Sequence, residues 1–145
     1  REQVLNFCAK ARELRPEITF GADIIAGFPT ESDEMFENTL RIIPEANLQF
    51  LHIFPYSQRD GTPAAKMPQV EKSIRRRRAE LLRDAGHLQL SIHYKSCVGK
   101  TVDVVFESND KARAEDFSLV KVINNNSGSK LKISGYNSHH YLVVE

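Results

Sequence analysis

The sequence is poor in cysteine and has no long apolar run. The first absence argues against disulfide-rich and zinc-binding proteins, and the second argues against a membrane-spanning protein. Only Cys8 and Cys97 are cysteines among the 145 residues, and they stand far apart, without a Cys-x-x-Cys pair. This pattern suggests neither a disulfide framework nor a zinc site. We expect two buried or inert thiols in a reducing cytoplasm. No apolar run approaches the ~18 residues of a membrane span, so no membrane partner is expected.

The sequence also lacks an initiator methionine and a signal-peptide pattern. It begins at Arg1, and no charged segment followed by an apolar stretch comes after it. We interpret the chain as a piece of a longer protein. Its composition, 41% hydrophobic and 27% charged with a net charge of +1, is that of an ordinary globular protein with one core or two small ones.

Positive charge is concentrated in the middle of the chain. Residues 66–100 carry nine lysines and arginines against three acidic residues, with a cluster in "IRRRRAELLR". Such a cluster can be the solvated face of a packing helix, or it can bind the phosphates of a nucleic acid. The sequence leaves both interpretations open.

The first half of the chain predicts alternating helices and buried strands. Apolar residues at helical spacing predict a helix over 2–14, and "ITFGADIIAGF" and "LQFLHIFPYS" read as buried strands of a parallel sheet. Ser32 is a good N-cap for a helix that Pro44 ends or bends. This order of elements is typical of an α/β fold.

A long helix beginning near Gln69 is predicted next, followed by several short strands. The apolar stripe expected on the helix comprises Ile74, Leu81, Leu82, Ala85, Leu88 and Ile92. "KTVDVVFES", "FSLVKVIN", "KLKISGY" and "HYLVVE", separated by turn segments such as "NNNSGS", indicate a small all-β barrel. We therefore predict two domains, residues 1–95 and 96–145.

Unusual residues follow both predicted parallel strands. One strand ends at Gly27-Phe28-Pro29-Thr30, and the other runs from Phe54 to Arg59. Ligands of parallel sheets bind at the carboxyl ends of the strands. A glycine permits close backbone approach, and an aromatic ring offers a flat apolar wall. These positions predict a ligand site.

The two segments together resemble a known enzyme family. "GADIIAGFPTES" followed by "LHIFPYSQRDGTPAAKMP" is similar to the C-terminal half of the radical S-adenosylmethionine domain of tRNA methylthiotransferases. The resemblance is nearest to the members that act on threonylcarbamoyladenosine. The tail from about Val98 resembles their TRAM domain, an RNA-binding β-barrel. The implied fold is the C-terminal part of a radical S-adenosylmethionine partial barrel followed by a TRAM barrel.

The resemblance implies a function for the longer protein. It would methylthiolate C2 of a modified adenosine beside the tRNA anticodon, with S-adenosylmethionine and two 4Fe–4S clusters as cofactors and tRNA as partner. The family holds one cluster with Cys-x3-Cys-x2-Cys and the second with three more cysteines. Cys8 and Cys97 match none of these positions, so the chain alone is expected to bind no cluster and to be inactive.

The resemblance also assigns site residues. No catalytic residue and no metal ligand is assigned. Positions implied beside S-adenosylmethionine are Ile25, Gly27, Phe28, Pro29, Phe54, Tyr56 and Ser57. Positions implied for the substrate are Arg59, Gly61 and Thr62, and the basic helix adds Arg75 and Arg78 as tRNA contacts.

Two other classes of function remain open from the sequence. The chain can be an RNA-binding module whose α/β part is structural, or part of a barrel enzyme with hydrolytic or isomerase chemistry. No pairing of a nucleophile with a base supports the second. The His139-His140 pair is interpreted as a loop feature. Two parallel strands alone leave unpaired edges, so we expect self-association through residues 48–54 or 18–27.

Overall fold

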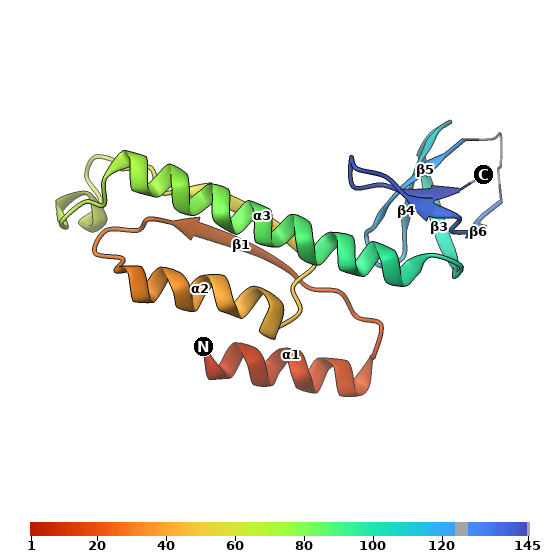
Figure 1. The fold of residues 1–145 in the computed structure, drawn as a ribbon, viewed down its shortest axis with the longest axis horizontal. Helices are drawn as coiled ribbons and strands as arrows, with labels where there is room; N and C mark the ends of the chain where they lie inside the picture. The colour runs from red at the N-terminus through yellow and green to blue at the C-terminus, as the bar shows by residue number, and fades with distance from the viewer. Residues whose placement is uncertain (124–127, 145) are drawn as a thin grey trace. The chain divides into compact units, whose positions relative to one another are not determined.

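The computed structural model describes residues 1–123 and 128–144, which divide into two compact units, Arg1–Gln89 and Leu90–Glu145. The long helix α3 passes from one unit into the other (Figure 1). The domain boundary at residue 96 stays a prediction. Most of the predicted turn segment at 124–129, and the last residue of the predicted strand at 140–145, lie outside the described residues.

The first unit alternates helices with two parallel strands, as the sequence predicts. Ser32 caps α2 by accepting a hydrogen bond from the Met35 backbone N–H. The two strands pair in parallel register, with Ile24 opposite Ile53. The elements are α1 (Glu2–Leu14), β1 (Gly21–Ala26), α2 (Asp33–Glu45), β2 (Phe50–Pro55), the 3-10 helix η1 (Pro63–Lys66) and α3 (Lys72–Cys97).

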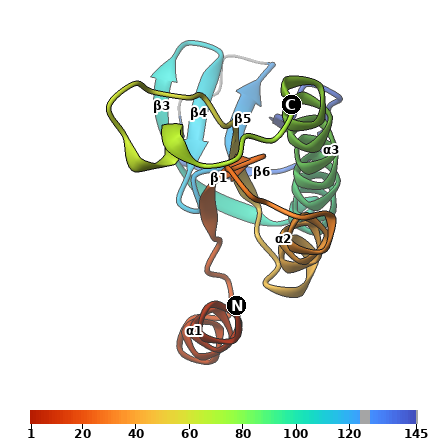
Figure 2. The same ribbon diagram turned by 90° about the vertical axis from the view of Figure 1, so that its left-hand side faces the viewer.

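One face of the strand pair is covered. Ala26 and Ile53 lie in a core with Phe36 and Ile43 of α2 and Leu82 of α3. Both helices lie on the same side of β1 (Figure 2). A second cluster joins α1 to the end of α2 and the start of β2 through Cys8, Ala46 and Leu48. The interior of this unit therefore lies on the helix side of the sheet.

The apolar stripe predicted on α3 is wrong in part. Leu82 and Ala85 pack on the sheet as expected, but Ile74, Leu81, Leu88 and Ile92 are exposed. The packed face instead uses small residues, because a Cβ atom at Gly86 would lie only 3.1 Å from Leu51 Cδ1. Ala79 is also fully buried. The helix approaches the sheet so closely that only small side chains fit between them. A prediction based on large apolar residues therefore puts the packed face of α3 in the wrong place.

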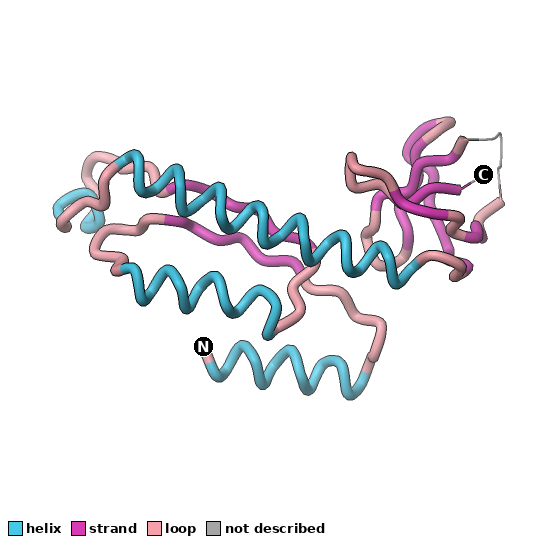
Figure 3. Tube along the Cα trace, viewed as in Figure 1, coloured by secondary structure: helices cyan, strands magenta, loops and turns pink. Residues whose placement is uncertain are grey.

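The second unit is a curled, mixed six-stranded sheet, drawn in magenta in Figure 3. The strand order is β6-β3-β4-β5-β8-β7, and β5 with β8 is its parallel pair. Its core joins Val120, Leu131 and Leu142 to Tyr94 from the last turns of α3. The strands are β3 (Thr101–Ser108), β4 (Lys111–Ala114), β5 (Leu119–Val122), β6 (Lys130–Lys132), β7 (Gly135–Tyr136) and β8 (Leu142–Val144).

The sequence reasoning missed β4. Its residues, Lys-Ala-Arg-Ala, have weak intrinsic preference for strands. It forms an antiparallel hairpin with β3, and its alternate residues Ala112 and Ala114 are buried in the core. Packing in the sheet decides the conformation here, and alanines give little periodic signal.

A partly buried polar network joins the end of α3 to the turn between β4 and β5. His93 Nε2 lies 2.8 Å from Asp116 Oδ2 and 3.7 Å from Cys97 Sγ. Burial acts to lower the pKa of His93, but hydrogen bonding with Asp116 and Cys97 outweighs it and raises the pKa to about 9. Burial acts to raise the pKa of Asp116, but hydrogen bonding with His93 and Ser118 lowers it. Both cysteines are free and buried.

None of the described helices combines the length and the apolar character needed to cross a lipid bilayer.

Candidate functional site

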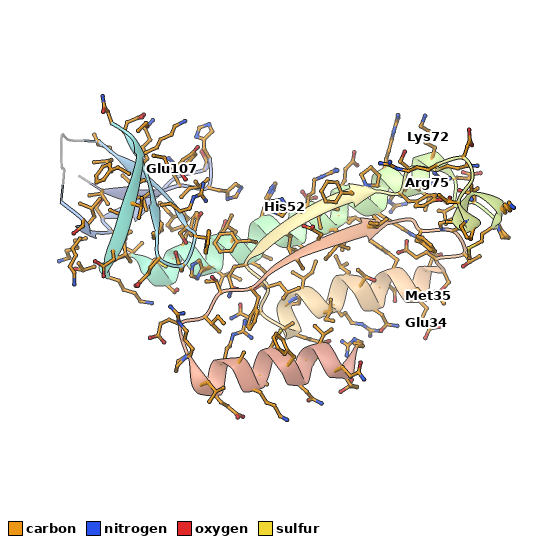
Figure 4. The ribbon with its side chains drawn as sticks, turned by 180° about the vertical axis from the view of Figure 1, so that it is seen from behind. Glu34, Met35, His52, Lys72, Arg75 and Glu107 are labelled. Atoms are coloured by element: carbon orange, nitrogen blue, oxygen red, sulfur yellow. The ribbon has the colours of Figure 1, made fainter. Side chains whose placement is uncertain are left out.

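The face of the β1–β2 pair opposite the helices is uncovered in the first unit. Side chains alternate along each strand, so register partners of parallel strands share a face. Asp23 pairs with His52 and Ile25 pairs with Phe54, and all four are exposed. This uncovered face thus carries an acid, an imidazole and two large apolar side chains. Figure 4 labels His52 on β2.

The loop after β1 is held in one conformation by hydrogen bonds. Gly27 has a φ of +72°, and its N–H donates to Glu31 Oε2 at 2.9 Å. Thr30 also has a positive φ, and its N–H donates to the Pro68 carbonyl at 3.1 Å. A left-handed threonine is uncommon and persists only where its surroundings hold it. The loop therefore folds back on itself through the Glu31 carboxylate.

Arg78 of α3 holds this loop from the helix side. Its Nη1 donates to the carbonyl and to Oε2 of Glu31, at 2.9 and 2.7 Å, and its Nη2 donates to Asp33 Oδ1 at 2.6 Å. The guanidinium carbon lies 5.3 Å from the ring centre of Phe36. Arg78 is only 6% exposed, so its charge is neutralised inside the fold.

Arg75 holds the end of the other strand. Its Nη1 donates to the Tyr56 carbonyl at 3.3 Å, and its Nε donates to the Val70 carbonyl at 2.6 Å. Its guanidinium carbon lies 5.3 Å from the Tyr56 ring centre. A Cβ atom at Gly27 would lie 2.5 Å from Arg75 Cγ, so the glycine makes room for the arginine stem. Figure 4 shows Arg75 at the start of α3, beside the strand-end loops.

An aromatic pair stands at the carboxyl ends of both strands. Phe28 and Tyr56 meet edge to face, with ring centres 5.4 Å apart and planes at 75°. Phe28, Phe54 and Ile25 are all substantially exposed. A large apolar surface therefore adjoins a loop that is fixed by hydrogen bonds, which is the combination expected of a site for a ligand with a flat ring.

Comparisons with known proteins agree with the motif-based resemblance. No family model matches the chain. The chain is 55% identical over 122 residues to threonylcarbamoyladenosine tRNA methylthiotransferase MtaB of Rickettsia prowazekii (strain Madrid E). It is 40% identical over 111 residues to a tRNA-2-methylthio-N(6)-dimethylallyladenosine synthase of Orientia tsutsugamushi (strain Boryong). A probable threonylcarbamoyladenosine tRNA methylthiotransferase of Methanocaldococcus jannaschii is 38% identical over 122 residues.

The chain is homologous to one segment of the tRNA methylthiotransferases. The matches cover 84%, 77% and 83% of this chain, but only 29%, 25% and 26% of the three relatives. The chain thus spans between a quarter and a third of the length of these methylthiotransferases.

The structure brings some of the predicted cofactor residues together in the first unit. Ile25 with Phe54, and Phe28 with Tyr56, form adjoining pairs, and Ser57 follows them as an exposed residue. Gly27 and Pro29 are buried and shape the loop from within. Their roles toward a cofactor stay predictions.

The predicted substrate residues fall into two groups. Arg59, Gly61 and Thr62 lie in the loop before η1, where Thr62 caps η1 by accepting from the Ala65 N–H and donates to the Arg59 carbonyl. Arg75 and Arg78 lie on α3 with their guanidinium groups bonded to the strand-end loops. Arg78 forms ion pairs with Glu31 and Asp33. The tRNA contacts predicted for both arginines remain untested.

Sequence reasoning missed three residues of the candidate site. Glu31 was given no role of its own, yet its carboxylate joins the Gly27 N–H to Arg78. Asp23 and His52 were passed over, although the side-chain period of two places them on the same face as Ile25 and Phe54. Applying that period to both strands would have found the pair.

The contact between Gly27 and Arg75 predicts an unequal cost for two glycine substitutions. In Gly61→Ala the new Cβ atom would have no neighbour within 4 Å, so the only cost is a positive φ at an alanine. We expect the free energy of unfolding to fall by about 1 kcal/mol. Gly27→Ala also displaces Arg75, and we expect a decrease of about 3 kcal/mol. Urea unfolding of the first unit measures both. Equal decreases would show that Arg75 does not fill the space beside Gly27.

Proposed function

We propose that this chain is a portion of a tRNA-modifying enzyme that methylthiolates C2 of a modified adenosine beside the anticodon. The observation that carries the proposal is the 55% identity over 122 residues to a threonylcarbamoyladenosine tRNA methylthiotransferase. The fixed loop and the aromatic pair at the carboxyl ends of β1 and β2 support it, since a parallel sheet binds ligands at those ends. Because tRNA is the proposed substrate, we place the protein in the cytoplasm.

The residues at the strand ends fit S-adenosylmethionine. Phe28, Tyr56 and Phe54 offer apolar ring surface for an adenine base, and Ile25 extends that surface along the uncovered face. When bound beside a reduced iron–sulfur cluster, S-adenosylmethionine supplies the radical that removes hydrogen from the target carbon and also supplies the methyl group. The role of this chain is to hold the adenosyl part in place and to keep water from it.

The chain's own cysteines do not fit an iron–sulfur cluster. Such clusters are held by several thiolates at one place, and the chain has only Cys8 and Cys97, which lie in different units. The two 4Fe–4S clusters are therefore assigned to other parts of the proposed enzyme.

The open edges of the β1–β2 pair also support a larger sheet in the complete enzyme. Within the described residues, β1 and β2 pair only with each other, so each has an edge of unpaired backbone groups. We propose that further strands of a radical S-adenosylmethionine partial barrel continue the sheet, and that the second unit is the TRAM barrel. The isolated chain would then self-associate through these edges, as the sequence predicts.

Basic residues at the start of α3 support a tRNA contact. The side chains of Arg76 and Arg77 are exposed and make no hydrogen bond or ion pair with the described residues. Free guanidinium groups can bind phosphates without reading sequence. We propose that Arg76 and Arg77 contact the tRNA backbone, while Arg75 and Arg78 serve the substrate by holding the neighbouring loops.

Analysis of tRNA nucleosides tests the proposed reaction. The complete protein that contains this segment is expressed in cells lacking their own methylthiotransferases, and digested tRNA is analysed by mass spectrometry. We expect a 2-methylthio derivative of threonylcarbamoyladenosine. A form with Phe28→Ala and Phe54→Ala should lose most of the product while remaining folded. Unmodified tRNA in cells that make the soluble, folded protein would contradict the proposal and favour a pure RNA-binding module.

The salt dependence of tRNA binding tests the proposed phosphate contacts. Removal of one phosphate contact lowers the slope of log affinity against log salt by about 0.7 to 0.9, so Arg76→Gln with Arg77→Gln should lower it by about 1.5. The control is Arg15→Gln with Arg41→Gln, which removes the same charge elsewhere in the unit. An equal effect of the two double variants would show that only net charge matters.

A further inference from the structure

Three side chains with metal-binding atoms converge in the second unit, and the proposed function uses none of them. His93 and Cys97 lie one helical turn apart on α3, so they share a face of the helix. Asp116 approaches them from the turn between β4 and β5. The His93 nitrogen, the Cys97 sulfur and an Asp116 oxygen all lie within 4.8 Å of one another.

The fold holds these groups in place. Cys97 is 4% exposed, and the side chains of His93 and Asp116 are 14% and 19% exposed. Asp116 Oδ1 accepts the Ser118 N–H at 2.9 Å, which directs Oδ2 toward His93. The turn itself is closed by hydrogen bonds between Ala114 and Ser118 and between Phe117 and Ala114. The three ligand atoms are therefore preorganised.

A single nitrogen faces several partners at once. His93 Nε2 lies 2.8 Å from Asp116 Oδ2, 3.3 Å from Ser118 Oγ and 3.7 Å from Cys97 Sγ. A ring nitrogen has either one hydrogen or one lone pair, so it cannot bond all three well. A cation between the nitrogen, the oxygen and the sulfur would satisfy every one of them. This convergence is what distinguishes the cluster from an ordinary ion pair.

We propose that His93, Cys97 and Asp116 form a site for a transition-metal ion of the Zn²⁺ type. Imidazole, thiolate and carboxylate are the ligands that Zn²⁺ takes, whereas Ca²⁺ and Mg²⁺ prefer sites made only of oxygen. Ser118 Oγ or a water molecule takes the fourth position. The ion joins the end of α3 to the β4–β5 turn and so stabilises the second unit.

The distances require only a small adjustment. In a tetrahedral zinc site, ligand nitrogen and sulfur atoms lie about 3.5 Å apart and nitrogen and oxygen atoms about 3.3 Å apart. The observed separation of His93 Nε2 from Cys97 Sγ is 3.7 Å, and that from Asp116 Oδ2 is 2.8 Å. Asp116 must therefore withdraw slightly, which a turn residue can do.

The charges also balance. The thiolate and the carboxylate together carry two negative charges, which a divalent ion neutralises. Any proton on the imidazole nitrogen or the thiol is released when that atom binds the ion, so the bound site carries no net charge. No uncompensated charge is left in the interior.

Cobalt titration of the full 145-residue chain tests the site. The metal-free, reduced protein is titrated anaerobically with Co²⁺, whose thiolate complexes absorb in the near ultraviolet and whose tetrahedral complexes absorb in the visible. We expect both absorptions to saturate at one equivalent and to disappear when Zn²⁺ is added. Zn²⁺ should also raise the melting temperature of the second unit.

Matched cysteine variants identify the ligand. Cys8→Ser removes the other buried cysteine and should leave the thiolate band unchanged, whereas Cys97→Ser should abolish it. Asp116→Asn leaves the core intact and should weaken Co²⁺ binding at least about tenfold, as should His93→Gln. These two variants decide the question even if Cys97→Ser fails to fold.

Several results would overturn the proposal. One is a wild-type chain without a thiolate band, and another is a band that persists in folded Cys97→Ser. Visible absorption without a thiolate band would place the ion elsewhere, for example at His139 and His140. Unchanged affinity in Asp116→Asn and His93→Gln would likewise exclude the cluster as the binding site.

Discussion

Two arginines at the start of α3 hold the carboxyl ends of both parallel strands, and the candidate site depends on them. Arg78 binds the carboxylate that closes the loop after β1, and Arg75 binds the backbone after β2. Both contacts require α3 to approach the sheet closely, and this explains Gly27 beside Arg75 and Gly86 beside Leu51. Charge, backbone conformation and helix packing are thus coupled at one place.

This coupling has a consequence for the proposed chemistry. A site must hold its ligand in a defined geometry, and residues fixed by their own hydrogen bonds do so at little cost in entropy. Here Glu31 and Arg78 fix the loop that carries Phe28, and Arg75 fixes the backbone that carries Tyr56. The aromatic pair is therefore placed by groups that need not touch the ligand themselves.

Much of the first unit could be predicted from sequence, because its elements have strong local signals. The helix at 2–14, the Ser32 cap and the parallel strands all follow from periodicity and capping chemistry. The packed face of α3 could not be found in this way, because small residues make the contact. β4 was missed because its strand conformation depends on neighbouring strands rather than on Lys, Ala and Arg.

The location of the candidate site in the sequence could be predicted, but the contacts between its side chains could not. The motifs located both strand ends, and the structure indeed pairs Ile25 with Phe54 and Phe28 with Tyr56. No sequence pattern indicates that Arg78 is bonded to Glu31, 47 residues away. The cluster of His93, Cys97 and Asp116 was hidden for the same reason, since a ligand 19 residues after Cys97 has no recognisable spacing.

Hydrogen exchange at the Gly27 amide tests most directly whether α3 holds the strand-end loop. The measurement compares the chain with its Arg78→Met form, using the amides of Val120 and Val122 in the second unit as an internal reference. The account predicts that Gly27 is protected in the parent chain and exchanges much faster in the variant, while the reference amides stay unchanged. Equal protection of Gly27 in both forms would show that the loop is held without the arginine, and would contradict the account.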